Sequence, residues 1–252
     1  MRAAWTTAAA LLVAMGASGG QLVDLSGTWA MVQVFPQIAV LPLIGQVQRT
    51  SVVGALVHVQ QEGCTVTMID YPCFTLVDHG SALVEVEFPE AFIRSLIPPV
   101  RTATLTQLPD GIRFDQPTCT EVRGAILDDP ANDPLPTDAH DEQGLDQDRD
   151  GRPGMTVHIT ILGALSGEAY VVQRIRYSLT GWLIGADRVE GLIDWTIEQT
   201  LLGTTNPLFR TDALDSPHPD PARHRFVMVR AGPAWDCETT RARLREILGP
   251  DH

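Results

Sequence analysis

Residues 50–69, TSVVGALVHVQQEGCTVTMI, carry the clearest fold signal in the chain. Two runs of β-favouring residues, Thr50 to Gln60 and Thr65 to Ile69, flank the trio Gln61-Glu62-Gly63. Gly63 can adopt a positive φ angle without steric cost, as a tight reversal of the chain requires. The stretch therefore predicts a β-hairpin.

Strand-like patterns recur along the rest of the chain. Residues 83–88 alternate apolar and acidic side chains with a period of two, which predicts one buried and one solvated face. The turn sequence Pro109-Asp110-Gly111 joins two further strands, and breaks are expected at 165–168 and 180–181. The expected strands cover 25–34, 50–60, 65–69, 83–88, 102–108, 112–116, 119–127, 155–162, 169–179, 182–195 and 224–230, with a helix as the alternative for 189–202.

Two short helices and two long loops interrupt these strands. Residues 90–97 follow Pro89 and predict a short helix, and Asp236 is a candidate N-cap for a closing helix that runs to Leu248. An acidic insertion at 128–154 and a proline-rich loop at 204–222 lack the apolar pattern of a core. We therefore expect a mainly β fold, an antiparallel barrel or a sandwich, with long loops and a C-terminal helix.

The N-terminus has the layout of an export signal. Arg2 precedes an apolar run from Ala8 to Met15, and small residues follow from Gly16 to Gly20. We expect residues 1–19 to be removed and 20–252 to form a single domain that is secreted or periplasmic. The later sequence offers no apolar stretch of the roughly 20 residues that a membrane-spanning helix needs, so no transmembrane segment is expected after cleavage.

All four cysteines lie after the predicted signal, and an even number in an exported chain predicts disulfides. Three pairings are open. Cys64 and Cys73 are close enough in sequence to bridge a hairpin, which would leave Cys119 to pair with Cys237. A zinc site is the alternative, although the chain has no paired Cys-x-x-Cys.

The charge of the chain argues against nucleic-acid partners. The formal net charge is -13, and the sequence shows no concentrated basic patch of the kind that phosphate binding needs. Anionic membrane surfaces are disfavoured for the same reason.

A calcium-loop pattern stands at residues 146–151, where aspartates alternate with other residues before a glycine. It resembles the start of an EF-hand loop and the aspartate-rich loops of thrombospondin type 3 repeats. The resemblance implies calcium bound by the carboxylates of Asp146, Asp148 and Asp150 and by the carbonyl of Arg152. Calcium would then order the long loop rather than take part in catalysis.

The pattern departs from an EF-hand at its end. The twelfth position, where an EF-hand has a bidentate glutamate, is Val157, and no helical pattern flanks the loop. Asp138, Asp141 or Glu142 could complete the ligand shell from the N-terminal side. The alternative is a solvated acidic loop without a metal.

The segment Ser26-Gly27-Thr28-Trp29 resembles the Gly-x-Trp signature of lipocalins, with Gly27 and Trp29 at the matching positions. The resemblance implies a closed β-barrel with an apolar cavity for a small hydrophobic ligand. It also implies that an arginine from a late strand packs on the tryptophan, a role open to Arg225 or Arg230. The alternative is an ordinary core tryptophan in another β fold.

No specific catalytic motif is present in the sequence, which has no Gly-x-Ser-x-Gly, His-Glu-x-x-His or phosphate-binding glycine loop. Asp78-His79 and His140-Asp141-Glu142 pair imidazole with carboxylate, but adjacent residues on a strand point to opposite faces. His218 and His224 are weak candidates for a transition-metal site.

We therefore expect an exported β protein that binds a small apolar ligand or a surface partner and has a calcium-ordered loop. A non-enzymatic role is favoured over an enzymatic one. Two alternatives remain. One is a structural envelope module without a cavity, and the other is a secreted hydrolase with an unrecognised active site.

Overall fold

The computed structural model describes residues 22–41, 45–80, 83–210 and 214–249, so the predicted signal segment lies outside the described residues. Within them the chain is mainly β, and its strands belong to one large antiparallel sheet. The strands are β1 (Gly27–Leu41), β2 (Gly45–Glu62), β3 (Thr65–Asp78), β4 (Val84–Glu87), β5 (Arg101–Leu108), β6 (Gly111–Arg123), β7 (Met155–Ile161), β8 (Leu165–Ile184), β9 (Arg188–Thr204), β10 (Leu214–Pro217) and β11 (Arg225–Arg230). The helices are α1 (Glu90–Ser95), α2 (Cys237–Ala242) and α3 (Leu244–Leu248), with short 3-10 turns at Pro207–Phe209 and Pro221–Arg223.

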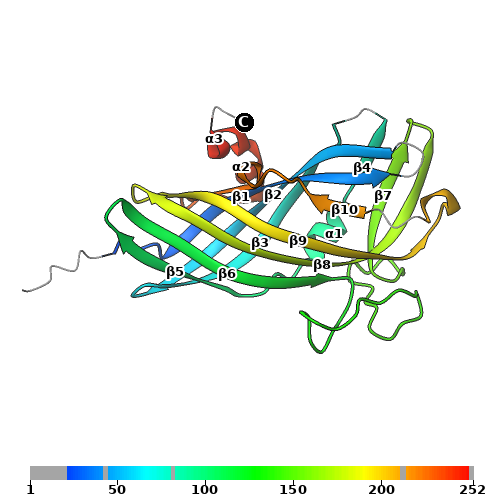
Figure 1. The fold of residues 1–252 in the computed structure, drawn as a ribbon, viewed down its shortest axis with the longest axis horizontal. Helices are drawn as coiled ribbons and strands as arrows, with labels where there is room; N and C mark the ends of the chain where they lie inside the picture. The colour runs from blue at the N-terminus through cyan, green and yellow to red at the C-terminus, as the bar shows by residue number, and fades with distance from the viewer. Residues whose placement is uncertain (1–21, 42–44, 81–82, 211–213, 250–252) are drawn as a thin grey trace, which may run out of the picture.

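The sheet is ring-like, because its strand pairings return to their starting point. Neighbours follow the order β8, β6, β5, β3, β2, β1, β11 and β9, and β9 pairs again with β8. Two further strands, β4 and β7, extend the sheet beside β8, and β10 pairs with β1. Figure 1 shows the long strands side by side, with α2 and α3 on one side and the loop between β6 and β7 on the opposite side of this view.

The predicted hairpin is confirmed as β2 and β3. Gln61 pairs with Val66 and Glu62 with Thr65, and Gly63 has a φ angle of 61° in the turn between them. The β3–β5 pairing is short and covers only Thr65–Met68, while the remainder of β3 continues beside β2. Helix α1 packs next to β3.

The two breaks predicted near β8 were wrong. Residues 165–168 and 180–181 lie inside β8, and the preceding turn falls at Leu162 and Gly163, both with positive φ. Gly181 instead faces Gly191 across the β8–β9 pair, where a Cβ atom on Gly191 would collide with the carbonyl of Thr180. These glycines permit a close approach of two strands, and residues 189–202 are a strand rather than a helix.

The closed end of the ring is built around Trp29, which is fully buried. Its indole Nε1 donates a hydrogen bond to the carbonyl of Leu25 at 2.7 Å, and the guanidinium of Arg230 lies 4.7 Å from the ring centroid. Arg230 also donates to the carbonyls of Ser26 and Asp24 at 2.9 and 2.8 Å. The expected arginine–tryptophan contact is therefore present, and Arg230 rather than Arg225 makes it.

The C-terminal helices cover the outer face of β1, β2 and β11. Ile247 is buried there against Ala30, Val32 and Val227. Asp236 caps α2 as predicted, because its side chain accepts a hydrogen bond from the Thr239 amide at 2.7 Å. The single closing helix that we expected is divided in two at Arg243, which ends α2 and precedes α3.

The observed disulfide joins Cys73 to Cys237, so the favoured pairings of Cys64 with Cys73 and Cys119 with Cys237 were wrong. Cys73 is the extra residue of a β-bulge in β3, which directs it to α2 on the outside of the ring. Cys64 is exposed at the hairpin turn and Cys119 is half-buried in the interior, and neither has a disulfide partner among the described residues. Burial raises the pKa of the Cys119 thiol, which favours its protonated form.

This pairing predicts two free thiols in the native protein. Alkylation of the unfolded, unreduced chain should label Cys64 and Cys119 only, and peptide mapping should recover Cys73 linked to Cys237. Intact mass measured before and after reduction checks the count. Four protected cysteines would contradict the prediction of two free thiols, and a linkage of Cys73 to any other cysteine would contradict the observed pairing.

Candidate functional site

A cavity of about 110 Å³ lies inside the ring. Its walls come from β1, β2, β3, β6, β8 and β9 and from the segment around α1, which lines it with Phe88, Phe92, Leu96 and Pro98. The strand residues in the lining are Gln33, Phe35, Gln37, Arg49, Ser51, Val53, Ala55, Asp70, Pro72, Thr75, Glu121, Arg123, Gln173, Ile175, Tyr177, Trp195 and Ile197.

Because side chains alternate between the two faces of a strand, every second residue points inward, and successive inward positions lie further from the packed interior. On β1, Trp29 and Met31 belong to the packed interior, and the next inward positions, Gln33 and Phe35, line the cavity. The interior of the ring is therefore solid at the Trp29 end and hollow further along the strands.

Asp70 and Tyr177 line the packed end of the cavity, its floor, and Asp70 forms a buried ion pair with Arg101 there. Arg101 is 2% exposed and donates to both carboxylate oxygens of Asp70, at 2.6 and 2.7 Å, and to the amide oxygen of Gln116. Its guanidinium lies 5.7 Å from the ring centroid of Tyr177. Burial raises the pKa of Tyr177 well above its usual value, so the phenol stays neutral. The charges of the floor compensate each other, as burial of an ion pair requires.

Aromatic side chains form much of the wall above this floor. Phe35 meets Trp195 edge to face with centroids 5.1 Å apart, and Phe88 lies 5.0 Å from Phe92. The indole Nε1 of Trp195 donates to Nδ1 of buried His224 at 2.6 Å. Because this hydrogen bond occupies the indole donor, Trp195 presents an apolar ring to the cavity.

Three glutamines also line the cavity, and they differ in their partners. The amide of Gln37 donates to the Ser51 hydroxyl at 2.8 Å, and the amide of Gln173 donates to Gln199 at 2.6 Å. Gln33 is 6% exposed, and its buried amide nitrogen has no hydrogen-bond partner among the residues that the structure describes. A buried donor without an acceptor costs about 1–3 kcal/mol.

The predicted aspartate group is brought together in the loop before β7. One carboxylate oxygen from each of Asp146, Asp148 and Asp150 lies within 4.8 Å of the others. Oδ2 of Asp148 accepts from the Thr156 amide at 2.9 Å, whereas its buried Oδ1 has no partner in the described chain. Burial raises the pKa of Asp148, and the charges of the two neighbouring aspartates add to the rise.

The other predicted ligands are not placed in this group. The amide of Arg152 donates to Asp150 at 2.8 Å, and its guanidinium lies 5.4 Å from the centroid of Tyr170. Asp138, Asp141 and Glu142 are not members of the aspartate group. The structure therefore brings together the three predicted side-chain ligands, and the Arg152 carbonyl stays a prediction.

Gln147 ties the aspartate loop to the cavity wall. Its amide nitrogen donates to the carbonyl of Ser95, the last residue of α1, at 2.7 Å, and its amide oxygen accepts from Gly124 at 2.8 Å. Since Phe92 and Leu96 at α1 line the cavity, the loop is hydrogen-bonded to an element of the site.

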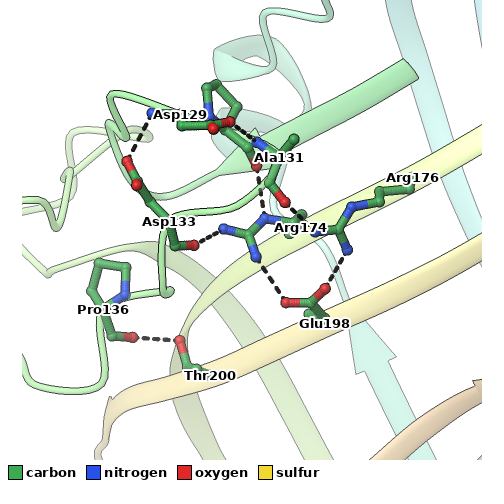
Figure 2. Close-up of polar contacts among 9 residues, drawn as sticks. Asp129, Ala131, Asp133, Pro136, Arg174, Arg176, Glu198 and Thr200 are labelled. Carbon is green, nitrogen blue, oxygen red and sulfur yellow. Dashed lines mark hydrogen bonds and ion pairs between the residues drawn. The ribbon is translucent and has the colours of Figure 1, made fainter. Parts of the chain in front are cut away.

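The first part of the acidic insertion is held against β8 and β9 by two arginines (Figure 2). Arg174, 3% exposed, donates to the carbonyls of Pro130 and Asp133, and Arg176 donates to the carbonyl of Ala131. Glu198 on β9 accepts from both arginines. The insertion contributes Leu135 to a buried cluster on this face, where it joins Leu127, just before the insertion, and side chains of β8 and β9.

The histidine candidates are engaged in structural contacts. Nε2 of His79 accepts from the Val86 amide at 3.0 Å, and burial, helped by the charge of Arg49, lowers the pKa of His79. Both ring nitrogens of His224 are hydrogen-bonded, Nδ1 to Trp195 and Nε2 to the carbonyl of His218 at 2.7 Å. His140 lies on the exposed insertion.

Comparison with known proteins gives no match among family models, among curated proteins or among solved structures. In the described part of the chain, no helix is long and apolar enough to cross a membrane.

Sequence reasoning did not identify the cavity residues, although β1 contains a signal for them. Trp29, Met31, Gln33, Phe35 and Gln37 share one face of the strand, and two glutamines interrupt an otherwise apolar pattern. Polar residues on an inward face are expected beside a cavity, because they would be costly in a packed core. The floor pair of Arg101 and Asp70 required the tertiary structure.

We expect the arginine contacts of the insertion to depend on pH. Hydrogen bonding from Arg176, together with the charges of both arginines, outweighs burial and lowers the pKa of Glu198 from 4.5. A carboxylate with a lowered folded-state pKa contributes stability above its unfolded pKa and loses it as pH falls through the folded value. Hydrogen exchange at residues 129–136, corrected for intrinsic rates, should therefore accelerate as pH falls below 4.5.

Glu198→Gln should show faster exchange at neutral pH and a weaker pH dependence. Because Glu198 is about half exposed, the loss should be modest, on the order of 0.5–1 kcal/mol. Glu90→Gln is a matched control, since Glu90 pairs with Arg94 on the exposed face of α1. Equal exchange in wild type and Glu198→Gln across the range would contradict the assigned contacts.

Proposed function

We propose that this chain is an exported binding protein that holds a small, mostly apolar molecule inside its ring-like sheet, and that calcium orders the loop beside the cavity. The observation that carries the proposal is the cavity itself. It combines a solid floor with aromatic walls, the usual composition of a small-molecule site. A molecule placed there would exchange water for the rings of Phe35, Phe92 and Trp195.

The residues around Trp29, at the closed end of the ring, support the interpretation of the fold as lipocalin-like. Gly27 and Trp29 stand at the signature positions of that family, and Arg230 packs on the tryptophan as the resemblance implies. Gly27 has a φ angle of 127°, and a Cβ atom there would lie 3.4 Å from the Arg230 guanidinium. The glycine therefore suits both the backbone conformation and the arginine contact. Similarity to lipocalins rests on these residues and on the ring-like sheet.

Export is supported by two independent features. The sequence begins with a signal-like segment, and the described chain contains a disulfide between residues 164 positions apart. We propose secretion or a periplasmic location on these grounds.

The cavity volume limits the ligand. A dry engineered cavity of about 150 Å³ binds benzene in another protein, so about 110 Å³ corresponds to a body no larger than one aromatic ring. A larger ligand would have to extend through the mouth or displace α1.

A cavity-filling variant tests the proposed site. Fluorobenzene should bind the wild type, with broadening of its ¹⁹F NMR signal, and Val53→Trp should abolish that broadening because Val53 lines the cavity. Gln60→Trp places the same side chain on an exposed position of β2 and should bind normally. Native mass spectrometry of protein exported from its own host identifies the resident adduct. Equal binding by both variants would place the ligand elsewhere.

For the loop, we propose that Asp146, Asp148 and Asp150 hold calcium. The oxygen donors suit a hard cation, and the buried Oδ1 of Asp148 lacks a partner in the described chain. Bound calcium would supply positive charge that offsets three clustered carboxylates. Because Gln147 lies within the same loop and contacts Ser95, ordering the loop would support α1 at the cavity.

Calcium should protect the aspartate loop from proteolysis, and Asp148→Asn should remove most of that protection. The raised pKa of Asp148 means that protons compete with the cation, so protection should weaken as pH is lowered. Asp110→Asn, in the exposed turn between β5 and β6, is the control. Protection that is the same in the presence of calcium or a chelator would exclude the calcium role.

A further inference from the structure

The cavity lining contains one glutamine, Gln33, whose buried amide nitrogen has no hydrogen-bond partner in the described chain. Gln33 lies one inward step along β1 from Met31 and one from Phe35. Met31 belongs to the floor, where its sulfur lies 3.8 Å from the Arg101 guanidinium, and Phe35 belongs to the aromatic wall. The unpartnered amide nitrogen of Gln33 therefore sits between the floor and the rings.

Several other polar groups of the lining already have protein partners. Gln37, Gln173 and the Trp195 indole each donate to a protein acceptor. Asp70 pairs with Arg101, Glu121 accepts from Arg123 at 2.6 Å, and Arg49 interacts within the chain. A charged ligand would bring a further charge into a site whose ion pairs are already formed, which is unfavourable in a partly desolvated cavity.

We propose that the ligand is an uncharged, single-ring-sized apolar molecule with one accepting oxygen, a carbonyl, ether or hydroxyl, that accepts a hydrogen bond from the Gln33 amide. The inference rests on the proposed binding function and specifies its ligand class. The oxygen lies deep, above the Arg101–Asp70 floor, and the apolar body lies against the rings of Phe35 and Trp195, further from the floor. Gln33 is then the residue that selects among apolar molecules of similar size.

Three probes of the same shape test this assignment; each has one ring and a short substituent, so part of each must extend through the opening of the cavity. Acetophenone carries the carbonyl, α-methylstyrene replaces its oxygen with a methylene group, and benzoate carries a charged carboxylate. One net hydrogen bond should make acetophenone bind about fivefold more tightly than α-methylstyrene. Affinities come from titration calorimetry and from displacement of fluorobenzene in the ¹⁹F assay, and benzoate should bind most weakly.

Gln33→Leu should remove the preference for acetophenone while retaining α-methylstyrene binding. Gln60→Leu, at an exposed position of β2, is the matched control and should keep the fivefold preference. A measurement on the wild type makes the test independent of how the variant folds: the side-chain amide NMR signals of Gln33 should shift with acetophenone and not with α-methylstyrene.

The outcomes separate this inference from the proposed function. Equal affinities for acetophenone and α-methylstyrene in the wild type would overturn the oxygen contact, and tightest binding of benzoate would overturn the uncharged ligand class. If fluorobenzene binds but none of the three probes does, the inference would also be overturned, while the proposed cavity function would stand. Absence of binding by all four compounds would overturn both.

Discussion

The pairing of β8 with β9 is the constraint on which the rest of the structure depends. It runs from Ala169–Thr204 to Ile184–Arg188 and turns an open antiparallel sheet into a ring. Closure requires a close approach at Gly181 and Gly191, where side chains on both strands would collide with backbone. Without that pairing the inward faces of β1 and β8 would not oppose each other, and no space would be enclosed between Gln33 and Gln173.

Polar and charged side chains line the cavity together with aromatic ones, although the site is proposed for an apolar molecule. Ionised groups are confined to pairs, as at Arg101 and Asp70, and most amides are satisfied by neighbours. These contacts hold the side chains of the wall in place at the cost of desolvating them. The outer face uses a related arrangement, in which Arg174 and Arg176 donate hydrogen bonds to backbone carbonyls of the acidic insertion (Figure 2).

The sequence predicted local structure better than tertiary partners. Alternation and turn chemistry identified most strands, the β2–β3 hairpin and the Asp236 cap, because these depend on neighbouring residues. Glycines misled the prediction where they serve contacts between strands, as at Gly181, instead of turns. The aspartate group was predictable from spacing within one loop, whereas the cavity and the Cys73 bond depend on elements that are distant in sequence.

The position of the disulfide has a consequence for biogenesis. Cys73 and Cys237 are 164 residues apart, so both Cys64 and Cys119 are synthesised before Cys237, the partner of Cys73. The thiol nearest in sequence, Cys64, is exposed and competes for the same sulfur by thiol exchange. Productive maturation therefore favours a host that delays oxidation or supplies a disulfide isomerase, and yield in a strongly oxidising host would be limited by mispaired chains.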